Sequence, residues 1–242
     1  MPASRSTVAA DDDSLLLPRG LIFLASLWLI AAWITAIGLR PPVQPSAATY
    51  TPAVRLMLFL VALGLLVVWP LMRLSGPPTK WAVRRTLLDL VVLLALMQVV
   101  VWPLRLVTPW SAGRTFLIDA TLVSWTMLVG AIVATALPRA GASRVVATML
   151  CAALGFMGSL TAWIGPPLFP WTAADLADGT VDRLGALTSL HRLTGGGPGP
   201  VDDAEWPALI VLAAAVVAAW IVVGVLTIVG TRGGRGQAQP IS

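Results

Sequence analysis

Charged residues are scarce in this sequence, and their scarcity excludes most classes of soluble protein. Of its 242 residues only 11% are charged and 57% are hydrophobic, whereas soluble globular chains carry roughly 25% charged residues. The sequence also has one cysteine, Cys151. A chain this apolar with a single cysteine is neither intrinsically disordered nor a small domain held by disulfides. The composition therefore predicts an integral membrane protein.

The sequence also has a single histidine, His191, which limits the chemistry available to it. Zinc and transition-metal sites generally use more than one His or Cys ligand. A haem held by two histidines is likewise excluded. Ser189 lies two residues before His191, so on a helix the two side chains point to different faces and form no nucleophile–base pair. We therefore expect no enzymatic activity, no cofactor and no metal site.

Six apolar runs are each long enough to cross a bilayer. A hydrocarbon core of about 30 Å requires roughly 20 residues of α-helix, and the runs lack the alternation of a membrane β-barrel. They cover residues 20–39, 54–74, 86–106, 115–137, 144–164 and 207–230. The sequence therefore predicts an all-α, polytopic membrane protein whose residues 20–230 form one bundle of six transmembrane helices.

The basic residues predict how this bundle is oriented. With six spans, ten of the 16 Lys and Arg residues fall on the side of the N-terminal tail (1–19) and the C-terminal tail (231–242), and six on the other. Loops richer in Lys and Arg stay in the cytoplasm, so both termini are expected there and the long loop 165–206 outside. Because these residues lie at the ends of apolar runs, the net charge of +5 indicates contact with lipid headgroups rather than nucleic acid.

The composition also suggests a cellular location. All but one of the basic residues are arginine, and Ala, Gly and Pro are abundant, as in proteins from GC-rich genomes. We therefore expect a multi-pass protein of a bacterial cytoplasmic (inner) membrane.

Eleven tryptophans mark the ends and interiors of the runs. Indole rings prefer the headgroup level of a bilayer, and the clearest predicted interface anchors are Trp69, Trp102, Trp163, Trp171 and Trp206. Two of them belong to a repeated VVWPL motif, which ends the second and third runs. The repeat fits either an inverted repeat of the transporter type or a tryptophan anchor followed by a helix-ending proline, and the second interpretation is preferred.

Small residues predict close helix packing in the last two runs. Cys151, Gly155 and Ser159 recur at every fourth position, as do Ala214 and Ala218. Small residues four apart line one helix face and let two backbones approach closely. These faces could pair with each other or with another chain, so an oligomer is possible.

Three polar residues fall inside the runs. Asp89 follows Arg85 by four residues and Asp119 follows Arg114 by five, so both acids are expected to be shallow and paired with an arginine on the same helix. A proton relay is the less favoured interpretation. Gln98 lies in mid-span and is expected to hydrogen-bond to another helix.

The loop 165–206 is the longest segment outside the runs. Residues 172–193 have helical character, with an imperfect apolar face that predicts a short helix resting on the membrane or on a partner. The sequence TGGGPGP at 194–200 then predicts a flexible joint. Glu205 lies just before Pro207, which is typical of the start of a helix.

Two functions remain open. The preferred one is a non-catalytic membrane subunit, structural, accessory or assembly-related, that binds lipid and other membrane subunits of a larger complex. The alternative rests on layout: six helices, two cytoplasmic termini and a long outer segment between spans five and six resemble the permease subunits of ABC-2 type exporters. That resemblance would place a contact with an ATPase subunit near residues 76–85.

Overall fold

The chain is described from a computed structural model, which covers residues 19–38, 47–79, 81–168 and 185–233, with side chains over 19–38, 50–79, 81–156 and 185–229. Within these ranges every regular element is a helix. The elements are α1 (Arg19–Ile37), α2 (Ala47–Leu63), η1 (Gly64–Val68), α3 (Trp69–Ser75), α4 (Ala82–Val101), η2 (Pro103–Leu106), α5 (Ala112–Ala136), α6 (Ala142–Leu168), α9 (Ala186–Gly195) and α10 (Glu205–Gly233).

Five stretches of helix are long and apolar enough to cross a membrane, in agreement with five of the six runs. They are Arg19–Ile37, Tyr50–Ser75, Ala82–Leu106, Ala112–Ala136 and Glu205–Val229. The sixth run, 144–164, lies within α6. Side chains of α6 are described only as far as Phe156, and the part Ala142–Phe156 is an apolar helix. This part alone is shorter than the roughly 20 residues that a crossing needs. The chain is thus an all-helical, multi-pass membrane protein with five candidate spans among the described residues.

The two VVWPL copies interrupt their helices in different ways. Proline lacks an N–H and crowds the preceding turn. Before Pro70 the helix widens into the π turn Gly64–Val68 and then continues to Ser75. At Pro103 the α-helix stops and the 3₁₀ turn Pro103–Leu106 follows. Proline therefore ends the helix at the second copy, whereas at the first copy that expectation is wrong because the π turn lets the span continue.

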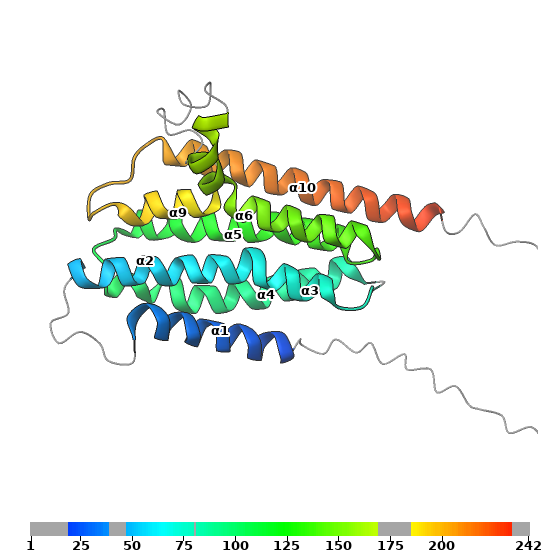
Figure 1. Ribbon diagram of the computed structural model, residues 1–242, viewed down its shortest axis with the longest axis horizontal. Helices are drawn as coiled ribbons and strands as arrows, with labels where there is room; N and C mark the ends of the chain where they lie inside the picture. The colour runs from blue at the N-terminus through cyan, green and yellow to red at the C-terminus, as the bar shows by residue number, and fades with distance from the viewer. Residues whose placement is uncertain (1–18, 39–46, 80, 169–184, 234–242) are drawn as a thin grey trace, which may run out of the picture.

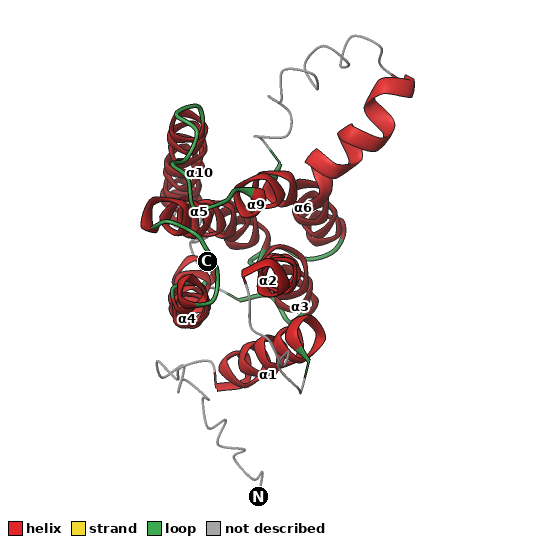
Figure 2. Cartoon of the chain, turned by 90° about the vertical axis from the view of Figure 1, so that its left-hand side faces the viewer, coloured by secondary structure: helices red, strands yellow, loops and turns green. Residues whose placement is uncertain are grey.

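Helix α5 lies at the centre of the bundle. Figure 2 shows α10 on one side of it and α4 on the other, with α9 and α6 beside it, and these four helices all contact α5. Two thirds of the most apolar part of α5 are buried, against 6% for α10. Helix α1 lies at the opposite margin, where it contacts α2 and α4. The marginal helices α1 and α10 therefore expose apolar side chains such as Phe23 and Ile210.

One tryptophan attaches each marginal helix to the bundle. The indole N–H of Trp28 in α1 donates to the carbonyl of Leu60 at 3.0 Å, and that of Trp220 in α10 donates to the carbonyl of Met127 at 3.0 Å. Gly64 makes room for the first ring, since a Cβ there would lie 2.5 Å from Trp28 Nε1. Both tryptophans therefore fill gaps between helices.

The bundle has two distinct ends. Helices α1 and α10 run in opposite directions, so the start of α1 and the end of α10 point to the same end (Figure 1). We call this the proximal end; the segments 76–79 and 137–141 also lie there. The opposite, distal end carries the start of α5 and the connection between α9 and α10.

Helix α9 is packed inside the bundle at the distal end, so the expectation of a surface helix is wrong for the described part of 172–193; residues 172–184 lie outside the described residues. Its apolar residues Ala186, Leu190 and Leu193 are buried, as are Ser189 and Thr194. The helix contacts α2, α5 and α6 (Figure 1). Leucines three apart drift around a helix, and their spacing does not indicate that neighbouring helices cover both resulting faces.

Candidate functional site

Asp89, in the second turn of α4, is held in an ion pair with the preceding helix. Its side chain is 1% exposed, and its Oδ2 lies 2.7 Å from Nε of Arg73. Nη2 of Arg73 also donates to Oδ1 at 3.1 Å. The expected partner, Arg85, is exposed and its charge acts on this carboxyl, but the described side chains form the ion pair with Arg73 instead, so the expected pairing is wrong. Because Asp89 faces α3, the pair ties two consecutive helices together.

Asp119 is buried in α5 with a neutral partner. The amide of Gln98 on α4 donates to Oδ1 of Asp119 at 2.7 Å, and the indole of Trp102 also interacts with this carboxyl. The expected cross-helix bond of Gln98 is thus confirmed. The expected pairing of Asp119 with Arg114 is wrong, and no ion pair joins Asp119 to any basic side chain that the structure describes.

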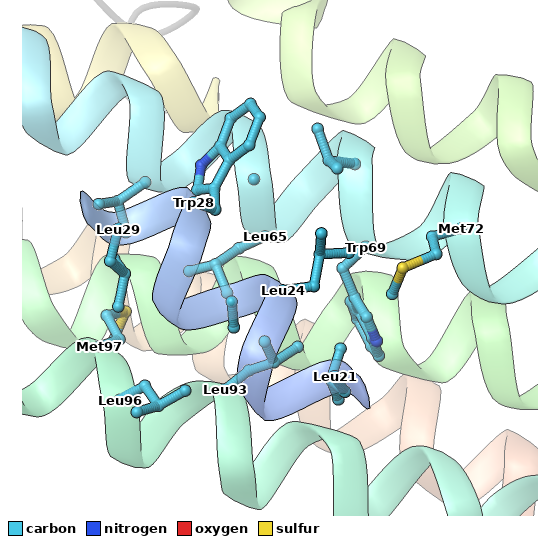
Figure 3. A pocket seen from close by; sticks show the side chains of 14 residues that line it. Leu21, Leu24, Trp28, Leu29, Leu65, Trp69, Met72, Leu93, Leu96 and Met97 are labelled. Atoms are coloured by element: carbon cyan, nitrogen blue, oxygen red, sulfur yellow. The ribbon is translucent and has the colours of Figure 1, made fainter. Parts of the chain in front are cut away.

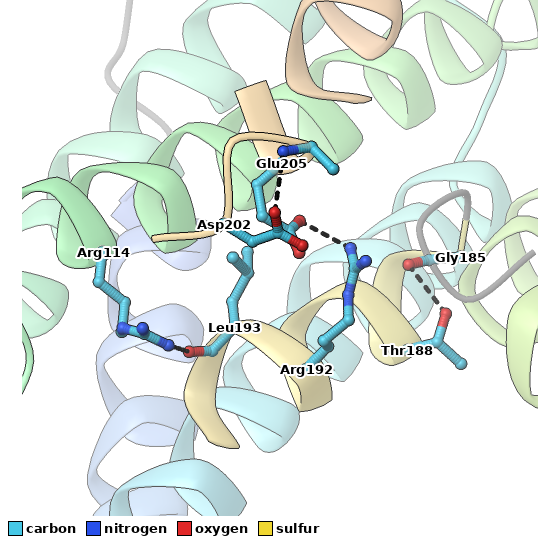
Figure 4. Close-up of polar contacts among 8 residues, drawn as sticks. Arg114, Gly185, Thr188, Arg192, Leu193, Asp202 and Glu205 are labelled. Carbon is cyan, nitrogen blue, oxygen red and sulfur yellow. Dashed lines mark hydrogen bonds and ion pairs between the residues drawn. The ribbon is translucent and has the colours of Figure 1, made fainter. Parts of the chain in front are cut away.

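Arg114, buried near the start of α5, binds the end of α9 instead. Its Nη1 donates to the carbonyl of Leu193 at 3.1 Å (Figure 4), and its Nη2 donates to the carbonyls of Gly199 and Pro200 at 3.4 Å. The last carbonyls of a helix have no partner within it, so the guanidinium satisfies the end of α9. A Cβ on Gly196 would lie 1.4 Å from Nη1. The sequence predicts a flexible joint for the TGGGPGP segment. In the structure its backbone binds the buried guanidinium of Arg114 instead.

A second ion pair joins α9 to α10. Arg192 Nη2 lies 2.7 Å from Oε2 of Glu205 (Figure 4). Glu205 is the first residue of α10, and its N–H donates to the carbonyl of Asp202 at 3.0 Å. A carboxylate in the first turn also interacts favourably with the helix dipole. The predicted start of this helix is confirmed, and the acid has a partner that the sequence did not indicate.

No arrangement suited to metal binding occurs among the described side chains, which contain no group of three or more His, Cys, Asp or Glu. His191 is exposed and stacks on Phe59 of α2, with the ring centroids 6.1 Å apart. His191 therefore contributes to the contact between α9 and α2.

The predicted anchors do not share one environment. Trp102 and Trp206 are 42% and 40% exposed, as an interface position requires. Trp69 is 3% exposed, and its ring lies among packed side chains beside Asp89. The structure therefore gives Trp69 a packing role. The side chains of Trp163 and Trp171 lie outside the described residues.

The predicted small-residue faces also differ. On α6 Cys151 and Gly155 are buried, and a Cβ on Gly155 would meet Val67 of the π turn at 3.6 Å. On α10 Ala214 and Ala218 are exposed. The two faces do not pair with each other over the described residues; Ser159 lies outside the described side chains.

Trp28 and Trp69 line an apolar cavity beneath α1 (Figure 3). Its volume is about 80 Å³, and Leu29, Met72 and Met97 complete much of its wall. Water needs several polar partners to occupy a cavity, and this wall offers almost none. We interpret the cavity as imperfect packing under a marginal helix.

The geometry therefore identifies no catalytic centre in the described part of the chain. It identifies two sets of contacts between helices, one at each end of the bundle. No family model matches the sequence, and neither the curated proteins nor the solved structures contain a significant match.

Proposed function

We propose that the chain crosses a bacterial inner membrane six times, with α6 as the fifth crossing and both termini in the cytoplasm. The support is that α6 extends from Ala142 to Leu168 and contains the apolar run 144–164. The excess of basic residues on the side of the tails supports the orientation. Reporter fusions test it: a cytoplasmic reporter active at one terminus and silent at the other would contradict an even number of crossings.

Within that membrane we propose a non-catalytic subunit, accessory or assembly-related, of a larger complex. The observation that carries this proposal is the exposed apolar surface of α10. It is apolar around its whole circumference, packs mainly on α5, and leaves Ala214 and Ala218 exposed. Lipid tails gain little from small side chains, whereas another helix can approach them closely. This face fits a helix of a neighbouring subunit.

The polar side chains support the same proposal. Asp89, Arg114, Arg192 and Glu205 all bind groups of this chain. A substrate pathway through the membrane would instead need polar groups directed at a cavity. The groups described here hold helices together.

The native mass in mild detergent tests the subunit proposal. We expect a complex much larger than a monomer or symmetric dimer, which Ala214→Trp and Ala218→Trp shift to the mass of the free chain because the bulky ring blocks close approach. Val146→Trp, on an exposed apolar position of α6, is the matched control and should leave the complex intact. A wild-type chain that elutes alone would contradict the proposal.

The alternative is a permease subunit of the ABC-2 type. It is favoured by one observation, namely that the segment between α6 and α10 contributes a helix to the bundle. In that case the native complex contains an ATP-binding subunit and hydrolyses ATP. A complex with no ATPase activity and no nucleotide-binding chain would remove this alternative.

A further inference from the structure

A groove runs between α4 and α10 at the proximal end of the bundle. Both helices pack on α5 from different sides (Figure 2), and the space between them is a groove of about 830 Å³. Its walls come from the start of α4, the end of α5 and the last turns of α10. The lining residues include Trp81, Arg84, Val91, Arg139 and Leu226.

The groove divides into a basic rim and an apolar interior. Arg84 is the third residue of α4, and Arg139 follows the end of α5 by three residues, so both lie at the level of the proximal turns. Val91 is seven residues beyond Arg84, about two helical turns deeper. The lining residues at that depth are apolar, and none of those described carries a negative charge.

The groove is also open toward the surroundings of the bundle. Val91 is 66% exposed and Leu226 is 47% exposed, although both side chains are apolar. Trp81 is exposed at the rim, where an indole ring suits the headgroup level. A ligand can therefore enter sideways from the membrane and leave a polar end beside the arginines.

We propose that this groove binds one anionic phospholipid, with an acyl chain between α4 and α10 and the phosphate beside Arg84 and Arg139. The charge of the rim favours an anionic headgroup over a zwitterionic one, because basic pockets between transmembrane helices recognise anionic lipids. The apolar interior favours an acyl chain over a soluble anion. The site depends on membrane insertion but not on either function proposed above.

Lipid-dependent thermal unfolding of the purified full chain tests the site. Phosphatidylglycerol added to a neutral detergent should raise the unfolding midpoint by several degrees more than phosphatidylcholine, because a ligand that binds the folded state stabilises it. Arg84→Gln/Arg139→Gln should lose most of this difference. Arg84→Lys/Arg139→Lys should keep most of it, and Arg105→Gln, which removes an exposed charge at the distal end, should keep all of it.

A second variant tests the acyl chain separately. Val91→Trp fills the groove and leaves both arginines in place, so it should also lose the phosphatidylglycerol effect. Inorganic phosphate alone should give no stabilisation. The proposal is overturned if phosphate reproduces the effect of the lipid, if Val91→Trp retains it, or if the arginine-to-glutamine variant responds like the wild type.

Discussion

At both ends of the bundle a buried or half-buried arginine binds backbone carbonyls, but the buried acids of the two ends have different partners. At the distal end Arg114 donates to three backbone carbonyls. At the proximal end Arg144 donates to four, those of Leu74, Gly76, Leu137 and Arg139. Each arginine thereby joins its own helix to the backbone of a neighbouring connecting segment.

The acids differ in what they pair with. Asp89 pairs with Arg73, whereas Asp119 has the neutral amide of Gln98. Each acid also lies beside the tryptophan of a VVWPL copy, Trp69 for Asp89 and Trp102 for Asp119. In both copies the tryptophan of the motif thus contacts an acid of the following helix. The two copies differ because an arginine balances the charge of Asp89, whereas no ion pair is described for Asp119. Removing a partner should therefore cost more at the proximal end.

The largest effect is expected for Arg73→Ala. It leaves Asp89 buried without its cation, which costs about 3–5 kcal/mol for pairs removed from water. The free energy of unfolding in detergent measures this loss. Arg85→Ala is the matched control, since Arg85 is exposed one turn before Asp89 and should change stability by less than about 0.5 kcal/mol. Equal losses in both variants would show that Arg85 stabilises the structure as much as Arg73 does, and would contradict the assignment of Arg73 as the partner.

At the distal end the largest effect is expected for Gly196→Ala. The guanidinium of Arg114 would have to move away from the new methyl group and give up its bonds to the carbonyls of Leu193, Gly199 and Pro200. Leaving buried hydrogen-bonding groups without partners costs about 1–3 kcal/mol. Gly197→Ala provides the control, because a Cβ at that position meets nothing within 4 Å. Thermal unfolding midpoints compare the two. If both variants have the same unfolding midpoint, the guanidinium of Arg114 does not lie against Gly196.

A smaller effect is expected for Gln98→Leu. Hydrogen bonds between transmembrane helices contribute about 0.6–2 kcal/mol, and this variant removes the amide donor to Asp119 while Trp102 stays in place. Asp119→Asn should restore stability in the Gln98→Leu background, because it removes the charge that the amide had solvated. Unfolding of the single and double variants checks this. No recovery in the double variant would mean that Asp119 is compensated by another group.

The smallest effect is expected for Arg192→Ala. Its ion pair with Glu205 is partly open to solvent, with Arg192 29% exposed, and such pairs contribute about 0.2–1 kcal/mol. The loss should shrink further at high salt, since salt screens exposed charges. Unfolding at low and high ionic strength measures both. A loss as large as that of Arg73→Ala would contradict this expectation, because it would show that the partly exposed pair stabilises the fold as much as the buried one.

The apolar runs predict the helices well because length and hydrophobicity alone decide which segments suit lipid. Gln98 was also predictable, since an amide in mid-span must bond to a neighbouring helix. The partners of Asp89 and Asp119 were not. Sequence proximity favours Arg85 and Arg114, but side-chain direction around each helix gives them to Arg73 and Gln98. The position of α9 depends likewise on contacts between segments far apart in the chain.

The attachment of α1 and α10 has a consequence for how this protein can vary. Each is fastened by an indole N–H to a main-chain carbonyl, that of Leu60 or Met127. Every residue type offers such a carbonyl, so replacing the acceptor residue leaves the bond available. Substitution is therefore more restricted at Trp28 and Trp220 than at Leu60 and Met127, and loss of either indole would weaken one outlying helix's attachment, which also includes its packing on α2 and α4 or on α5.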